Sequence, residues 1–409
     1  MLFSHTSRTL FPNLRFLSWG YERPFRLSHI AAQTMRTLHL DFRCGEISEC
    51  RNVLDSVGNL CPLIERFRLY LSRQYVELDT IMSNQVLRWS NLRILECSDV
   101  ALNADAILHI SRTSTLTHLS FVLNEEAPGQ ILPSDLDLVF PNLTWCDITS
   151  GRLLPVANLF ARTRLPAIKE LTVRFPGSPS KQAIWSFMTS LKNTCSSSSL
   201  THFSILSQRY LLRRLSTCGD FGSNNCPITY DDLHPCASLC SLRFLKLNFD
   251  QPIHLTDNDL VGLGTAWPHL EDLIVNNDAG WRSIGGLTLP GLIRLLRTCP
   301  SLRNFCILLD TPTFVYIPEG MEMSYPPRQL GCVNLVESPL DADMFDGVVD
   351  VFVTLKFSPR LLIAWRRVET EQRRAVGVPQ TAFRSWRDLD DKVKARIASA
   401  TETKDEMGA

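Results

Sequence analysis

The chain has 409 residues, 44% of them hydrophobic, and 42 basic residues balance 42 acidic ones to a formal net charge of zero. This balance excludes the global basic field that drives phosphate binding, and no stretch approaches the roughly 18 consecutive apolar residues of a membrane span. We therefore expect neither nucleic acid nor membrane as a partner, and we expect the protein in the cytoplasm or the nucleus.

A short apolar phrase, L-x-x-L-x-L, recurs along the chain at intervals of roughly 21 to 33 residues, with one longer interval. Its first positions are Leu14, Met35, Ile64, Leu92, Leu116, Leu143, Ile168, Leu200, Leu242, Leu270 and Leu302. This period is typical of one short strand plus one helix in each unit of a leucine-rich solenoid. The sequence therefore predicts an α/β fold, a leucine-rich repeat solenoid (horseshoe) with parallel strands on the concave side and helices on the convex side.

Helical spacing appears between the strand phrases. Cys50, Val53, Leu54 and Val57 follow a period of 3.6, and they predict one of the outer helices. Thr256 precedes two aspartates as a helix N-cap with an acidic first turn. Each unit is thus predicted to consist of helix, turn and strand.

Strand phrases of this kind normally continue to an Asn eight residues after the first anchor, where its side chain ties the turn. In this chain the position is Asn only at Asn124, while Asp250, Asp278 and Asp310 substitute for it. The other side chains at this position cannot make the same bonds, so we expect an irregular ladder of turns.

The long interval between Leu200 and Leu242 predicts an inserted loop near 207–229. Its surroundings hold a cluster of possible metal ligands: Cys218, Cys226, His234, Cys236 and Cys240. Because the tight C-x-x-C knuckle of zinc sites is missing, core thiols and loop residues are the favoured interpretation. The thirteen cysteines are expected to be mostly reduced core residues.

The sequence contains no complete catalytic motif. Asp220-Phe221-Gly222 matches a kinase tripeptide, but no glycine-rich loop or H-R-D loop accompanies it. We expect no enzyme activity, no catalytic residues, no cofactor and no metal.

The repeat phrase stops after Trp365, so the predicted solenoid covers 1–365 and a charged tail covers 366–409. Within the tail, Phe383, Trp386, Leu389, Val393 and Ile397 form one stripe at helical spacing. This stripe predicts a helix over 382–398 that folds back as a cap.

Whole phrases, such as Leu10-Phe11-Pro12-Asn13-Leu14 and Leu255-Thr256-Asp257-Asn258-Asp259-Leu260, resemble the repeat part of large fungal F-box proteins. The resemblance implies a substrate receptor of a Skp/cullin/F-box ubiquitin ligase, with the target protein held by the repeats. The first phrase begins about ten residues after Met1, so we expect the F-box itself to be absent. The Skp/cullin core is then expected as a partner only if a missing F-box is supplied. The alternatives are a fragment or a natural paralogue without the F-box, and a free-standing interaction scaffold unrelated to ubiquitylation.

Side chains alternate along a strand, so positions two, four and six after each first anchor are predicted to face the concave side. The candidate partner-binding residues are the large or charged ones among them: Phe16, Arg66, Arg68, Tyr70, Trp145 and Phe244. Exposed aromatic residues beside arginines are typical of protein-recognition hot spots. The equally weighted alternative is that Phe16, Trp145 and Phe244 pack across neighbouring strands. His39, His118 and His202 are expected to be solvated polar residues.

Overall fold

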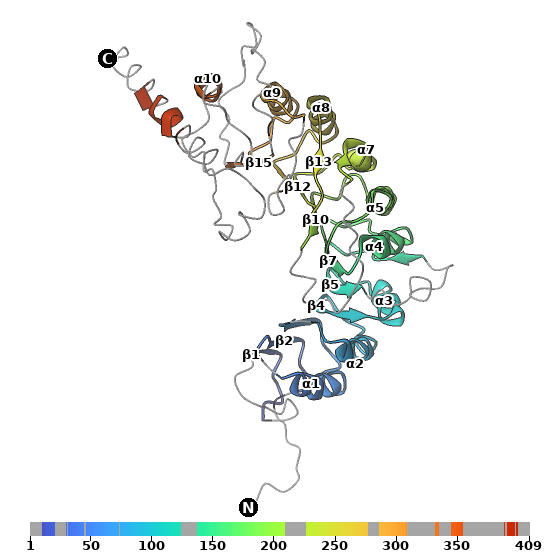
Figure 1. Cartoon of the computed structure of the whole chain (residues 1–409). Coiled ribbons are helices and arrows are strands. Elements are labelled where there is room, and N and C mark those ends of the chain that lie inside the picture. Colours follow the sequence, from blue (N-terminus) through green and yellow to red (C-terminus); the bar gives the residue numbers. More distant parts are fainter. Residues whose placement is uncertain are drawn as a thin grey trace, which may run out of the picture. The chain divides into compact units, whose positions relative to one another are not determined.

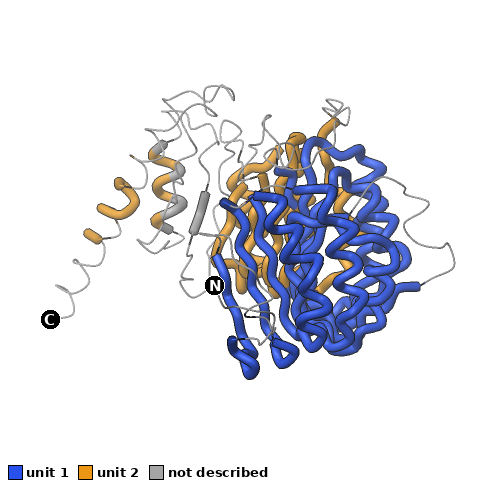
Figure 2. The backbone as a smooth tube through the Cα atoms, turned by 90° about the horizontal axis from the view of Figure 1, so that it is seen from below, with its two compact units in different colours: residues 1–201, 206–222 blue, residues 202–205, 223–409 orange. Residues whose placement is uncertain are grey.

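A computed structural model describes residues 10–20, 30, 32–44, 46–72, 74–123, 137–208, 226–276, 286–307, 309, 332–334, 345–354, 388, 391–396 and 398–399. The chain divides into two compact units, one comprising 1–201 and 206–222 and the other 202–205 and 223–409 (Figure 2). Strand β10 (His202–Ser207) contributes residues to both units. Each unit is described by itself below.

Unit 1 is built on a parallel sheet with the neighbour order β1-β2-β3-β4-β5-β7-β9. These strands are β1 (Phe16–Gly20), β2 (Thr37–Phe42), β3 (Arg66–Leu71), β4 (Ile94–Leu102), β5 (His118–Leu123), β7 (Trp145–Ser150) and β9 (Glu170–Phe175). A two-residue parallel pair, β6 (Leu138–Val139) with β8 (Thr163–Arg164), lies apart from this sheet. The predicted parallel order of the strands is confirmed, and each strand of the seven-stranded order begins two residues after the first anchor of its phrase.

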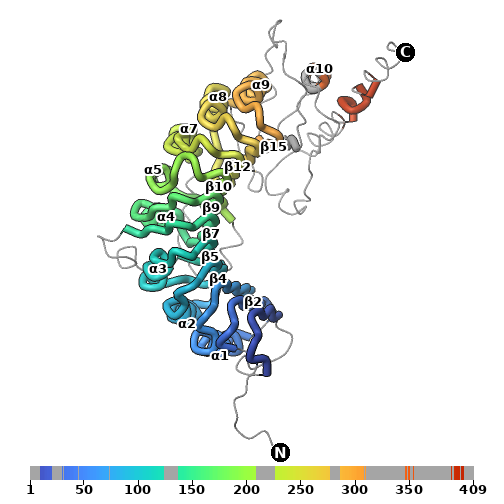
Figure 3. The backbone as a smooth tube through the Cα atoms, turned by 180° about the vertical axis from the view of Figure 1, so that it is seen from behind, coloured from blue at the N-terminus to red at the C-terminus, as the bar shows by residue number. Residues whose placement is uncertain are grey.

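The helices of unit 1 lie along one side of this sheet (Figures 1 and 3). They are α1 (Ile47–Leu60), α2 (Val76–Val86), α3 (Ala104–Ser111), α4 (Leu153–Phe160) and α5 (Lys181–Thr194). In α1 the predicted apolar stripe is buried at Cys50, Val53, Leu54 and Val57. The strand anchors face the same core, since burial alternates along β3 and only Phe67, Leu69 and Leu71 are buried.

Unit 2 repeats this plan with shorter strands. Its parallel sheet has the neighbour order β12-β14-β15-β16, and β11 pairs with β13 in a second, two-stranded sheet. The strands are β11 (Ile228–Thr229), β12 (Phe244–Asn248), β13 (Ile253–His254), β14 (Asp272–Val275), β15 (Asn304–Cys306) and β16 (Cys332–Asn334). The helices are α7 (Tyr230–Leu233), a 3-10 turn η2 (His234–Ser238), α8 (Asp257–Ala266), α9 (Leu289–Thr298) and α10 (Phe345–Thr354).

The predicted cap of α8 is present. Thr256 accepts a hydrogen bond from the backbone N of Asp259, whose carboxylate in turn accepts one from the backbone N of Thr256 at 2.8 Å. This reciprocal pair satisfies two of the backbone donors that a helix start leaves unpaired. The alternation of parallel strand and helix in both units identifies the fold as an α/β leucine-rich repeat solenoid.

Several sequence-based predictions fall largely on residues outside the described set. They include most of the inserted loop near 207–229, most of the tail 366–409, and the turn positions Asn124, Asp278 and Asp310. The described tail residues 391–396 are helical, and Lys392 and Arg396 form ion pairs with Asp346 and Asp350 on α10. The domain limits and the capping role of this helix stay predictions.

Cysteines follow the predicted pattern where they are described. Cys50, Cys61, Cys97, Cys146, Cys195, Cys236, Cys299 and Cys306 are buried with free thiols, whereas Cys44, Cys226 and Cys240 are exposed. Burial raises the pKa of the Cys50 and Cys61 thiols to about 12, so both are protonated at neutral pH.

Candidate protein-binding face

The side chains of unit 1 that point away from the helices form what we call the open face of its sheet. The strand register aligns them in rows that run across the strands. The first row consists of Phe16, Thr37, Arg66, Ile94, His118, Trp145 and Glu170, and the second of Ser18, His39, Arg68, Glu96, Ser120, Asp147 and Thr172. The sequence pattern alone predicted which side chains lie on this face.

Accessibility differs along the open face. Over β1 to β3, Phe16 is 56% and Tyr70 is 37% exposed, and Arg66 is exposed as well. Over β5 and β7 the outward residues Ser120, Asp147 and Thr149 are instead buried. A first accessible part of the face therefore covers β1 to β4; the face is less accessible over β5 and β7 and is exposed again at Glu170 on β9.

Glu96 organises the centre of this accessible part. Its Oε2 lies 3.0 Å from Arg68 Nε on the neighbouring strand, as an ion pair whose angle is not that of a hydrogen bond. The Tyr70 hydroxyl donates a long hydrogen bond of 3.5 Å to the same oxygen. Burial and the charge of Glu96 raise the pKa of Tyr70, so its hydroxyl stays protonated and available as a donor.

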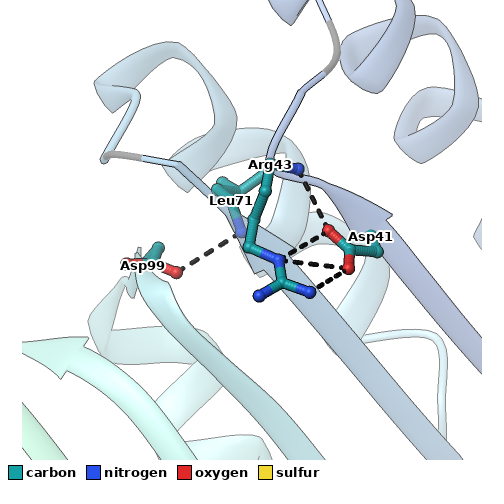
Figure 4. A network of polar contacts seen from close by, with 4 residues as sticks. All are labelled: Asp41, Arg43, Leu71 and Asp99. Atoms are coloured by element: carbon teal, nitrogen blue, oxygen red, sulfur yellow. Dashed lines mark hydrogen bonds and ion pairs between the residues drawn. The ribbon is translucent and has the colours of Figure 1, made fainter. Parts of the chain in front are cut away.

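Two polar contacts border this part of the face near the carboxyl ends of β2 and β3 (Figure 4). Arg43 binds both carboxylate oxygens of Asp41, at 3.0 Å through Nε and 2.5 Å through Nη2, and its guanidinium lies 6.0 Å from the Tyr70 ring centroid. The backbone N of Leu71 donates to Asp99 Oδ2 at 3.4 Å. The hydrogen bonds from Arg43 hold the pKa of Asp41 below its usual range. These contacts fix the ends of β2 and β3 and so orient Tyr70.

Each of three strand histidines lies against an aromatic ring. Ring centroids are separated by 5.5 Å between Phe16 and His39, by 6.0 Å between His118 and Trp145, and, in unit 2, by 5.8 Å between His202 and Phe244. His202 is exposed and His39 and His118 are partly exposed, so each histidine keeps contact with solvent as expected and also packs on a ring.

The six candidate residues do not all come together. Phe16 lies on β1, and Arg66, Arg68 and Tyr70 lie on β3, with β2 between these two strands; Trp145 is half-buried farther along the first row. Phe244 belongs to unit 2. We call Phe16, His39, Arg66, Arg68 and Tyr70 the β1–β3 patch.

Sequence reasoning missed the acidic partners Asp41, Glu96 and Asp147. Asp147 binds Arg174 with two hydrogen bonds of 3.0 Å, Nε to Oδ1 and Nη2 to Oδ2. All three acidic residues occupy positions four or six after a first anchor. The signal was thus present in the same pattern that selected the aromatic and basic residues.

The possible metal ligands do not form a site within the described part of the chain. There, no group of three His, Cys, Asp or Glu side chains is arranged to hold a metal ion; Cys218 lies outside the described residues. Cys236 is buried, and its carbonyl oxygen accepts a hydrogen bond from Trp267 Nε1 at 3.3 Å. Cys236 thus belongs to the core of unit 2.

A cavity of about 330 Å³ lies beside the helix starts of unit 2, lined in part by Tyr230, His254, Thr256 and Asp259. Of these lining residues, Thr256 and Asp259 are engaged in the cap of α8. None of the described helices is long and apolar enough to cross a membrane.

No family profile and no curated protein sequence matches this chain. Among solved structures, an internalin from Listeria monocytogenes is similar, with 15% identical residues over 63% of this chain and 76% of the internalin, at a TM-score of 0.24. The fold assignment rests on the strand and helix order described above, and this match adds no argument about partners.

Proposed function

We propose that this chain is a protein-binding scaffold that holds a partner protein on the open face of unit 1. The observation that carries the proposal is the β1–β3 patch, where Phe16 and Tyr70 expose large rings beside Arg66 and Arg68. Aromatic and arginine side chains supply most of the binding energy in protein interfaces. Glu96 contacts Arg68 and Tyr70, and His39 packs on Phe16, so these three side chains lose little entropy on binding.

The resemblance to the repeat part of F-box proteins favours one use of such a scaffold, the recognition of substrates for a ubiquitin ligase. In that role the repeats bind the target, and a separate F-box docks on the Skp/cullin core. The second candidate is a free-standing scaffold, which binds the same partner without any link to ubiquitylation. The compartment, cytoplasm or nucleus, stays a prediction in both cases.

Site-specific photo-crosslinking tests the binding face. A photoreactive residue at Tyr70 should form protein adducts in a lysate, and excess unlabelled chain should compete them away. The matched control is the same residue at Trp185, an aromatic side chain on α5 that is 53% exposed. Equal adducts at both positions would show that the open face is not the binding surface.

Alanine substitution measures the strength of the contacts. The Phe16→Ala/Tyr70→Ala double variant should lose the captured partner, since each hot-spot side chain contributes roughly 2 kcal/mol or more. Trp185→Ala should retain it, and circular dichroism should show all variants folded.

A fusion experiment separates the two candidates. An F-box joined to the N-terminus, together with purified Skp, cullin and ubiquitin-transfer enzymes, should lead to ubiquitylation of the captured partner if the chain is a substrate receptor. A partner that binds the fusion protein but is never modified supports the free-standing scaffold.

A further inference from the structure

Around Arg66, arginines outnumber the carboxylates that pair with them. Glu65 lies between two arginines of the neighbouring strand starts, 2.6 Å from Arg36 and 3.6 Å from Arg93. Glu96 is engaged by Arg68 at 3.0 Å. Three arginines thus share two carboxylates, and no described carboxylate lies within ion-pair distance of Arg66 itself.

The neighbours of Arg66 along the first row provide no charge either. Thr37 and Ile94 flank it directly, and the exposed Phe16 ring lies one strand beyond Thr37. With neighbouring strands spaced about 4.8 Å apart, Phe16 and Arg66 are roughly 10 Å from each other. The row therefore presents one cation between an aromatic ring on one side and an aliphatic side chain on the other.

The local field at this point is positive. The pKa of His39, which packs on Phe16, is lowered first by burial and then by the charges of Arg68 and Arg66, against the opposing effect of Glu96. An anion placed over Arg66 would thus be attracted by more than one group.

We infer that the β1–β3 patch, together with the neighbouring Ile94 of β4, binds an extended, acidic peptide segment of the partner, with a carboxylate on Arg66 and apolar side chains on Phe16 and Ile94. This inference rests on the proposed function and names the chemistry of its partner. An arginine fork binds a carboxylate through two parallel hydrogen bonds, which fixes the register of the segment. An extended chain repeats its side chains on one face about every 7 Å, which is also the spacing of successive rows along each strand of the open face.

Selection from a displayed library of short random peptides tests the inference with the full chain as bait. The wild type should enrich peptides with Asp or Glu beside aromatic or aliphatic residues. Arg66→Glu should reverse the preference to Lys and Arg, because the substitution inverts the charge at the centre of the row. Arg112→Glu, on an exposed arginine at the end of α3, is the matched control and should keep the acidic preference.

A selected peptide then provides the quantitative measurement. Its affinity should fall about tenfold to a hundredfold with Arg66→Ala, and the variant should show a weaker dependence on salt. Circular dichroism confirms that each variant is folded.

Three outcomes would overturn the inference. They are selection of no peptide by the wild type, selection without acidic preference, and a change of preference with Arg112→Glu equal to that with Arg66→Glu. None of them decides the proposed function, which depends on crosslinking at Tyr70. A partner that crosslinks at Tyr70 while the library shows no acidic preference would keep the scaffold and discard the acidic segment.

Discussion

The two units use the same device to anchor a helix on the core. Trp89 in unit 1 and Trp267 in unit 2 are both fully buried, and each donates from Nε1 to the carbonyl of a buried cysteine, Cys61 at 3.2 Å and Cys236 at 3.3 Å. The indole fills the space under the helix end, and its one polar group finds a backbone acceptor there. Both units thus pair the one polar group of a buried indole in the same way.

They differ in the length of their strands. β2, β3, β5, β7 and β9 have six residues each, whereas β14 has four and β15 and β16 have three. Because every second residue points outward, a six-residue strand presents three side chains on its open side and a three-residue strand only one or two. A short strand is enough to build a core, while a long one also builds a surface for a partner.

Turn chemistry differs as well. In unit 2, Asn276 adopts a left-handed backbone with φ of 49°, accepts from the backbone N of Phe249 at 2.8 Å and donates to the carbonyl of Gln251 at 2.9 Å. In unit 1, Asp99 accepts from the backbone N of Leu71. These ties occur six and seven residues after the first anchor, earlier than the eighth position that the repeat pattern indicated.

The largest expected effect compares how much one buried anchor contributes to the free energy of unfolding in each unit. Leu95→Ala in unit 1 and Leu245→Ala in unit 2 should each lower the free energy of unfolding by about 2 to 5 kcal/mol, because a buried anchor is replaced by a cavity. Urea denaturation measures the loss, and hydrogen exchange shows which unit opens.

Leu154→Ala is the control for these anchors, since this leucine is 46% exposed on α4; it should cost no more than about 0.5 kcal/mol. A loss below about 1 kcal/mol at Leu245 would mean that it is not an anchor.

A smaller effect tests the turn of unit 2. Asn276→Ala should destabilise the protein by about 1 to 3 kcal/mol, because the buried amide of Phe249 loses its acceptor. Asn276→Gly loses the same bonds but tolerates the left-handed backbone, so thermal unfolding should show it to be the milder substitution. If the alanine and glycine substitutions destabilise the protein equally, the left-handed backbone of residue 276 does not contribute to the loss of stability.

The smallest effect concerns the Asp41–Arg43 turn of unit 1. The contact with Arg43 lowers the pKa of the Asp41 carboxyl in the folded state. The ionised carboxylate therefore stabilises the folded protein fully above the unfolded pKa of about 3.9, and this stabilisation is lost as the pH falls through the folded pKa. The pair lies at the surface, where solvent screens the charges, so its contribution to the free energy of unfolding should be the smallest of those compared.

Denaturation curves from about pH 5 down to pH 2 provide the measurement. Asp41→Asn should be slightly less stable at the upper end, and the difference from the wild type should shrink toward the lower end. Asp55→Asn on the exposed side of α1 should show no such trend. If the difference in the free energy of unfolding between Asp41→Asn and the wild type does not change with pH, the ionised Asp41 carboxylate does not stabilise the turn.

The sequence by itself determined the repeat, the parallel order and the identity of the outward residues. Periodicity suffices for these features because an alternating strand such as Arg66–Leu71 has only one way to bury Phe67, Leu69 and Leu71. The N-cap at Thr256 was predicted for a similar reason, since its chemistry involves only residues three positions apart.

Only the tertiary structure decided which outward residues are accessible and which charges are matched. Thr149 and Tyr70 both lie six residues after a first anchor, yet Thr149 is buried and Tyr70 is exposed. Arg68 and Arg66 are two residues apart on one strand, yet only Arg68 faces a carboxylate, because register places Glu96 opposite it and Ile94 opposite Arg66. Register and burial depend on groups that lie roughly 25 residues away along the chain, and a local pattern carries no information about such distant neighbours.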